Sequence, residues 1–132
     1  MALLIDTDLL IDIERGVGTD RTEALLGDEE RAISVITVSE LLHCVARATG
    51  ARRLQRSAFV EHLLAGLQAI PITEPVARIH AAVWADLAGR GDIIGAHDLW
   101  IAATGLAHGL GVATRNTSDF ERVAGLRVVT AA

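Results

Sequence analysis

The chain has 132 residues and a formal net charge of −5, and its length suits one domain with one hydrophobic core, which we expect to span residues 1–132. Aromatic residues make up only 3% of the sequence, so Ala, Val, Leu and Ile must build that core. The acidic balance counts against a passive basic coat for nucleic acid, but not against an enzyme whose acidic site is filled by cations.

The amino-terminal half alternates apolar, strand-like runs with helical patterns. Residues 2–5 form a short apolar run typical of a buried strand, and apolar residues at helical spacing predict a helix over residues 8–15. A short polar helix is expected over residues 20–30, and the β-branched run 32–37 predicts a second buried strand. A helix that opens with Ser39 and Glu40 completes this half.

The carboxy-terminal half continues the same alternation. Pro71 lies in the short apolar run 69–72, which therefore suits the edge or the end of a strand. In chain order, we expect helix 51–67, strand 69–72, helix 74–89, a glycine-containing loop, helix 96–108, strand 112–114, a helical turn at 118–123 and strand 126–129. This order predicts an α/β fold with a mostly parallel central sheet of about four or five strands flanked by helices.

The cysteine content and the hydropathy indicate where the protein works. Cys44 is the one cysteine, so an intramolecular disulfide and a cysteine-based zinc site are both excluded, which favours a reducing compartment. No apolar run approaches the roughly 20 residues of a membrane helix, and no positively charged segment of a signal peptide opens the chain. We therefore expect a cytoplasmic protein without a membrane partner.

Four acids occupy related places in the expected elements. Asp6 ends the first strand, Glu40 follows the second, Asp98 begins an apolar helix, and Asp119 follows the strand 112–114. Because the carboxyl ends of parallel strands share one edge of a sheet, we expect these carboxylates to converge. Converging carboxylates repel one another, and Mg²⁺ relieves that repulsion, with Mn²⁺ able to substitute. The chemistry that follows is metal-assisted phosphodiester hydrolysis.

Four motifs around these acids resemble the PIN-domain ribonucleases, and within them the VapC toxins of bacterial toxin–antitoxin pairs. The match covers nearly the whole chain and keeps the order of the family's motifs. The motifs are Leu4-Ile5-Asp6-Thr7-Asp8-Leu9-Leu10-Ile11, Ile36-Thr37-Val38-Ser39-Glu40-Leu41, His97-Asp98-Leu99-Trp100-Ile101-Ala102-Ala103-Thr104, and Thr114-Arg115-Asn116-Thr117-Ser118-Asp119-Phe120.

The resemblance implies a Mg²⁺-dependent endoribonuclease that acts as the toxin of such a pair. It implies that Asp6 and Asp98 are the main metal ligands and that Glu40 and Asp119 complete the catalytic acids. It also implies that Thr7 hydrogen-bonds a carboxylate or the RNA phosphate. The implied partners are RNA, a VapB-type antitoxin over the helical groove beside the site, and a second copy of the chain in a homodimer.

Two positions depart from the family pattern. Asp8 stands where Ser or Asn is usual and adds a charge near the site. Asn116 stands where many relatives carry the fourth acid, which is why the fourth carboxylate is assigned to Asp119. Arg115, between the fourth strand and these residues, is the expected phosphate contact.

Each acid also has a structural interpretation. Asp6 could serve only as a helix N-cap, and Asp98 and Asp119 could do the same for later helices. Glu40 could be an exposed acid favoured by the helix dipole. Asp12, on the first helix, is expected to be solvated.

Other functions remain open at this stage. Asp6-Thr7-Asp8 also resembles the start of haloacid-dehalogenase phosphatases, but these enzymes and the receiver domains of signalling proteins usually place a Lys at the phosphoryl group, and all 12 basic residues here are Arg. A helical phosphohydrolase with His97 and Asp98 as a metal dyad conflicts with the expected strands. A non-catalytic α/β binding module would require the acids to be incidental.

Overall fold

A parallel sheet of five strands forms the centre of the molecule. The computed structural model describes residues 2–130, so residues 1, 131 and 132 of the expected domain lie outside the described residues. Every pair of neighbouring strands is parallel, in the order β3-β2-β1-β4-β5, which confirms the predicted α/β class. The strands are β1 (Ala2–Ile5), β2 (Glu30–Ser34), β3 (Gln68–Ile70), β4 (Gly111–Thr114) and β5 (Val128–Thr130).

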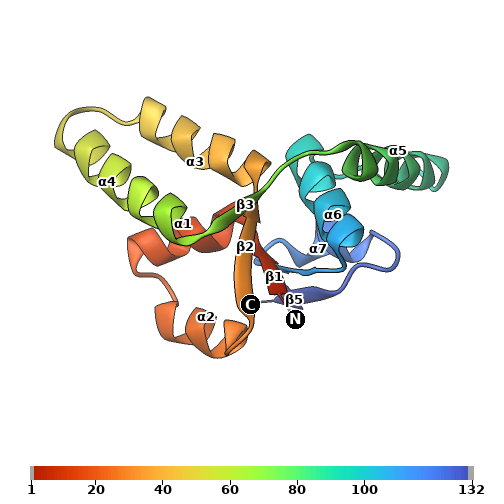
Figure 1. Ribbon diagram of the computed structural model, residues 1–132, viewed down its shortest axis with the longest axis horizontal. Helices are drawn as coiled ribbons and strands as arrows, with labels where there is room; N and C mark the ends of the chain where they lie inside the picture. Colours follow the sequence, from red (N-terminus) through yellow and green to blue (C-terminus); the bar gives the residue numbers. More distant parts are fainter. Residues whose placement is uncertain (1, 131–132) are drawn as a thin grey trace.

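Helices cover both faces of the sheet (Figure 1). One face carries α1 (Thr7–Arg15), α2 (Thr19–Leu26), α3 (Val35–Arg47) and α4 (Gly50–Gly66). The other face carries α5 (Glu74–Gly89), α6 (Ala96–His108) and α7 (Thr117–Glu121). No helix within residues 2–130 is long and apolar enough to cross a membrane.

Side-chain alternation along the strands divides the core between these two layers. Leu3 and Ile5 of β1 are buried in the cluster beneath α1 to α4, whereas Leu4 is buried in the cluster beneath α5 to α7. Because successive residues of a strand point to opposite faces, a short run of apolar residues can serve both clusters at once. This arrangement fixes β1 at the centre of the fold.

The chain changes its direction across the sheet at β1. From β1 it moves outward to β2 and β3, and it then crosses back to place β4 on the other side of β1. The connections after β1 and β4 therefore lead to helices on opposite faces, α1 and α7. In open parallel sheets such a reversal leaves a crevice at the carboxyl ends of the strands, where ligands bind.

The main correction to the predicted elements concerns the second strand and the helix after it. The strand was expected over residues 32–37, with a helix opening at Ser39 and Glu40, but β2 ends at Ser34 and α3 begins at Val35. Ser34 caps the helix, since its hydroxyl accepts a hydrogen bond of 3.1 Å from the Ile36 N–H. The cap and the packing of α3 override the weak strand preference of the β-branched residues.

The remaining boundary differences are small. The polar helix expected over residues 20–30 is α2, which ends at Leu26 because Gly27 follows with a φ of 55°. Glu30 therefore begins β2 instead of ending a helix. Pro71 lies just beyond β3, where it interrupts no ladder hydrogen bond, and the last strand runs to Thr130.

Candidate active site

Asp6 lies at the switch point, the place where the chain reverses its direction across the sheet, immediately after β1 and beside β4. It is the N-cap of α1, and its Oδ1 accepts a hydrogen bond of 2.8 Å from the Thr7 N–H. Its Oδ2 accepts a hydrogen bond of 2.7 Å from the hydroxyl of Thr114, the last residue of β4. Asp6 is therefore both a helix cap and a buried carboxylate, 4% exposed, held between the two central strands.

Glu40 reaches the same crevice from α3, where Thr7, Glu40 and His97 line a hollow of about 310 Å³. Thr7 Oγ1 donates a hydrogen bond of 2.8 Å to Glu40 Oε1 and lies 3.1 Å from the hydroxyl of Thr37. The other carboxylate oxygen, Oε2, is 3.5 Å from Nδ1 of His97. The predicted hydrogen bond between Thr7 and a carboxylate is thus present, although Glu40 lies farther along its helix than expected.

Asp98, Asn116 and Asp119 form the opposite side of the crevice. Asp98 is in the first turn of α6, as the sequence predicts, and Asp119 lies in α7. Asn116 Nδ2 donates hydrogen bonds of 3.0 Å to Asp98 Oδ2 and 3.3 Å to Asp119 Oδ2. Its own N–H donates to Thr114 Oγ1 at 2.8 Å, so the hydroxyl that binds Asp6 also anchors this side.

The electrostatics show that the four acids share one environment. Burial raises the pKa of Asp6 to about 7, and repulsion from Asp8 and Asp98 adds to this rise. Burial likewise raises the pKa of Asp98 to about 6, with further contributions from Asp119 and Glu40. Each of these raised pKa values reports the cost of placing a negative charge in a desolvated, acidic crevice. The structure therefore brings together the acids that the sequence places far apart.

A divalent cation would relieve this repulsion. The donors are carboxylate oxygens, which suit a hard ion, and Asp8 Oδ1 is buried without a hydrogen-bond partner. Across residues 2–130, however, no three His, Cys, Asp or Glu side chains form a ready-made ligand set. The amide of Asn116 instead bridges two of the acids. The donor types fit a metal ion, and binding it would require the carboxylates to draw closer.

The structure corrects the expectation for Asp12. Instead of being solvated, Asp12 is buried at 7% exposure, and its Oδ2 lies 2.8 Å from Nε of Arg115. The same nitrogen is 3.9 Å from Asp8 Oδ2. The sequence does show that Asp8 and Asp12 are one helical turn apart and so share a helix face. It does not show that Arg115, far along the chain, pairs with them.

Two further residues near the acids have contacts that the sequence analysis did not assign. Thr114 lies within the fourth motif and joins Asp6 to Asn116, yet its role depends on the pairing of β1 with β4. His97 lies across from Glu40 because α6 begins close to α3. Both residues lie within the motifs and next to predicted site residues, but the sequence does not indicate which side chains they contact.

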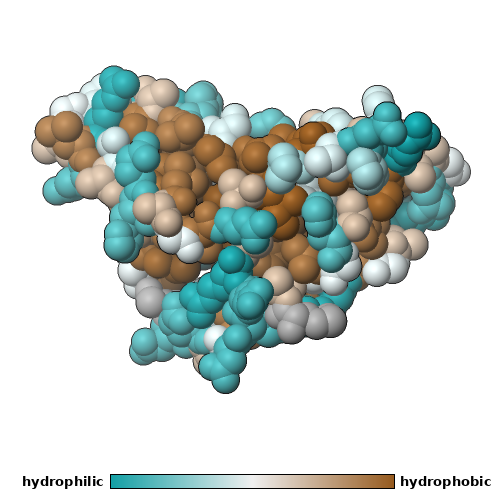
Figure 2. Space-filling model, viewed as in Figure 1, coloured by the Kyte–Doolittle hydropathy of each residue, from teal (hydrophilic) through white to brown (hydrophobic). Residues whose placement is uncertain are grey.

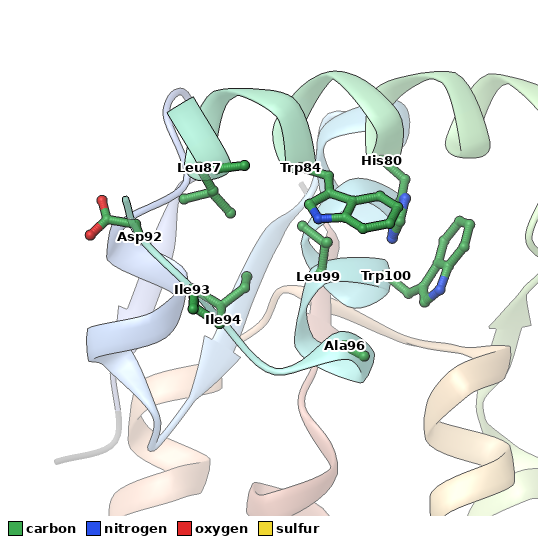
Figure 3. Close-up of a pocket in the computed structure, with 10 residues that line it drawn as sticks. His80, Trp84, Leu87, Asp92, Ile93, Ile94, Ala96, Leu99 and Trp100 are labelled. Carbon is green, nitrogen blue, oxygen red and sulfur yellow. The ribbon is translucent and has the colours of Figure 1, made fainter. Parts of the chain in front are cut away.

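A second hollow, of about 430 Å³, lies between α5, α6 and the loop before α6, and none of the four acids lines it. Figure 3 shows His80 and Trp84 from α5 facing Leu99 and Trp100 from α6. The rings of His80 and Trp100 are stacked with centroids 3.6 Å apart, and burial lowers the pKa of His80. The hollow is apolar, in contrast to the acidic crevice.

Comparisons with known proteins agree on one family. Residues 3–126 match the model of the PIN domain. Ribonuclease VapC1 of Rickettsia felis is 34% identical over 131 residues, which are 98% of this chain and 96% of the relative. A VapBC-5 toxin–antitoxin structure from Mycobacterium tuberculosis has a TM-score of 0.80 at 31% identity, covering 98% of this chain and 96% of the other.

A further solved structure, FitAcB from Neisseria gonorrhoeae, has a TM-score of 0.82 at 32% identity and covers 98% of this chain and 97% of its own. These similarities cover nearly the whole chain. With its cluster of acids at the carboxyl ends of β1 and β4, the chain belongs to the PIN-domain family and, within it, to the VapC-type ribonucleases.

Proposed function

We propose that this protein is a Mg²⁺-dependent endoribonuclease that acts as the toxin of a toxin–antitoxin pair. The observation that carries the proposal is the meeting of Asp6, Glu40, Asp98 and Asp119 in one crevice, where Asp6 and Asp98 have raised pKa values. Such a site is unfavourable without cations and favourable for binding a metal together with a phosphate. The similarity to VapC ribonucleases supports RNA as the polymer that is cut.

The catalytic roles follow from the positions of the acids. Divalent-metal dependence is general among PIN-domain nucleases, and we assign Mg²⁺, with Mn²⁺ as a substitute. Asp6 and Asp98 would hold the ion, while Glu40 and Asp119 complete the acidic set. When bound, the ion lowers the pKa of a coordinated water and offsets charge on the phosphate oxygens.

The remaining residues of the crevice orient these acids and the RNA. The hydroxyl of Thr114 fixes Asp6, and the hydroxyl of Thr7 fixes Glu40. The side-chain amide of Asn116 donates to both Asp98 and Asp119 and so links the two acids. Arg115, half exposed beside the crevice, would contact the RNA phosphate.

A VapB-type antitoxin is the proposed inhibitor. Figure 2 shows hydrophobic side chains gathered over α3 and α4 on the face drawn there. A hollow of about 330 Å³ between α1, α2 and α4 is lined by the apolar side chains of Leu10, Ile13, Leu26, Leu63 and Leu67. The M. tuberculosis structure is that of a member of the VapBC family of toxin–antitoxin systems, which supports an antitoxin as a partner of this chain, and we place its segment in this groove.

A second copy of the chain is the proposed partner on the opposite side. Ile93 is 83% exposed and Trp84 is 60% exposed, both beside the apolar hollow between α5 and α6. Contiguous exposed apolar surface often marks a protein interface, and these two side chains adjoin one apolar hollow. We place the homodimer in the cytoplasm, where its RNA substrate and antitoxin are made.

Metal-dependent cleavage is the direct test. The purified chain is incubated with structured and unstructured RNA in Mg²⁺, Mn²⁺ or EDTA, and the products are resolved on a denaturing gel. Cleavage that requires a divalent ion and is absent in EDTA is expected. Turnover of a small phosphate ester without RNA cleavage under any metal would favour the phosphatase, and no turnover of either would leave a binding module.

A further inference from the structure

Asp12 is a buried acid that the proposed metal site does not use. Its side chain is 9% exposed, and its ion pair with Arg115 joins α1 to the loop after β4 at 2.8 Å. A buried carboxylate is costly unless it is paired, so Arg115 compensates for its desolvation. The pair therefore couples the middle of α1 to the edge of the acidic crevice.

Arg115 is the residue between two anchors of the crevice. Thr114 binds Asp6, and Asn116 binds both Asp98 and Asp119, so the backbone on each side of Arg115 is tied to the acids. Its guanidinium lies 3.9 Å from Asp8, whose charge in turn raises the pKa of Asp6. The Arg115 guanidinium is thus held close to Asp8, which is itself close enough to Asp6 to affect its pKa.

The exposure of the two partners is unequal. Asp12 is buried, whereas 52% of the Arg115 side chain remains exposed to solvent. The neighbouring ion pair between Glu14 and Arg56 differs, since its side chains are 21% and 19% exposed. A buried anchor beneath an accessible guanidinium presents a fixed positive charge to an approaching ligand, and fixing the side chain beforehand lowers the entropy lost on binding.

We propose that Asp12 is a positioning residue for RNA: its carboxylate holds the Arg115 guanidinium beside the acidic crevice, where it binds the phosphate next to the scissile one. This inference rests on the proposed nuclease function. Asp12 acts only through Arg115 in this role. The role can therefore be tested by RNA binding, independently of RNA cleavage.

The first experiment measures binding without cleavage. A labelled single-stranded RNA oligonucleotide is titrated with the full chain in EDTA, and fluorescence anisotropy gives Kd over a range of salt concentrations. Arg115→Gln is expected to weaken binding by about tenfold, as for loss of a hydrogen bond to a charged group. It should also lower the slope of log Kd against log salt by about 0.7, the value for one phosphate contact on a single strand.

The second experiment is a double-mutant cycle. Asp12→Asn should weaken binding by about threefold in the wild-type background, as an indirect effect, and should have no further effect in Arg115→Gln, because the two residues act as one unit. Glu14→Gln, on the same helix with its own Arg partner, is the matched control and should bind as the wild type does. Thermal unfolding establishes that each variant is folded.

The outcomes separate this inference from the proposed function. An Asp12→Asn effect that persists in the Arg115→Gln background, or a loss of stability with unchanged Kd, overturns the positioning role. RNA binding that follows the cycle without any cleavage overturns the nuclease and leaves the positioning role standing. Cleavage by a wild type whose Arg115→Gln variant binds equally well overturns the positioning role alone. Absence of RNA binding in EDTA also overturns the positioning role, and the cleavage assay in Mg²⁺ then decides the nuclease function.

Discussion

The side-chain amide of Asn116 donates a hydrogen bond of 3.0 Å to the carboxylate of Asp98. The same amide donates to Asp119 at 3.3 Å, so one neutral side chain offsets part of the repulsion between two acids. A carboxylate at position 116 could not donate to either acid. Asn116 thus stabilises the acidic crevice when no metal is bound.

Asn116→Asp is expected to destabilise the metal-free protein and to strengthen metal binding. The change replaces two donated hydrogen bonds with repulsion, which should cost about 1–3 kcal/mol of unfolding free energy in EDTA. Thermal unfolding in EDTA and in Mn²⁺ measures both effects, since the added carboxylate should enlarge the stabilisation by the ion. An equal response of variant and wild type to Mn²⁺ would remove position 116 from the metal site.

Asp98→Asn is expected to abolish RNA cleavage and to leave the fold intact. Burial and the charges of Asp119 and Glu40 raise the pKa of Asp98 to about 6, so a neutral amide removes an unfavourable charge at pH 7. The variant should therefore be as stable as the wild type, or more so, in EDTA. Single-turnover cleavage and urea unfolding measure the two quantities, and normal cleavage by the variant would exclude Asp98 from catalysis.

The stability of the metal-free protein should fall as the pH rises from about 4 to about 7. Asp6 and Asp98 have pKa values of about 7 and about 6 in the folded state against the ordinary value of 3.8, so the native state binds more protons than the unfolded state in this window. Their contribution is fully present below the unfolded value and is lost as pH rises through the folded values. Urea unfolding in EDTA across this range, compared with the Asp6→Asn/Asp98→Asn double variant, should show a steeper decline in the wild type. Equal slopes would contradict the raised pKa values.

Thr114→Val should raise the pKa of Asp6 further. The hydroxyl of Thr114 donates at 2.7 Å to Asp6 and lowers its pKa, so an isosteric methyl group removes a bond that favours the charged carboxylate. Carbon-13 NMR titration of the Asp6 carboxyl group measures the change, and cleavage near pH 7 should fall with it. Thr104→Val is the matched control, because its buried hydroxyl donates at 2.8 Å to a carbonyl within α6. A similar shift in both variants would point to a general loss of packing.

Ile93→Asp should convert the proposed homodimer to a monomer without unfolding it. The side chain is 83% exposed in the single chain, so a charge there is well solvated in the monomer and becomes costly only when a second copy covers it. Sedimentation velocity of the variant and of wild type measures the change. An unchanged sedimentation coefficient would place the interface elsewhere or show that the protein is monomeric.

The alternation of apolar strands and amphipathic helices was sufficient to predict the parallel sheet and its two helical layers. It could not predict the strand order, because pairing β4 with β1 depends on contacts between segments distant in the sequence. The β-branched residues after Ser34 also misplaced a boundary, since a local cap and packing outweigh intrinsic preference.

The sequence predicted the part of the candidate site that depends on local signals and missed the part that depends on contacts between distant segments. Asp6 and Asp98 could be placed because each adjoins a recognisable strand or helix end. Asp12 was misjudged as solvated, since a charged residue in a helix gives no sign of a partner beyond β4. The raised pKa values of Asp6 and Asp98 likewise come from burial and mutual repulsion, which exist only once the chain is folded.

The position of β1 in the middle of the sheet has a consequence for synthesis. Asp6 emerges from the ribosome early, but its partner Thr114 lies 108 residues later, so β1 cannot be flanked on both sides until β4 has been made. A nascent fragment that ends before β4 therefore lacks the wall of the crevice that holds this acid. The acidic site can therefore be completed only after β4 has been translated.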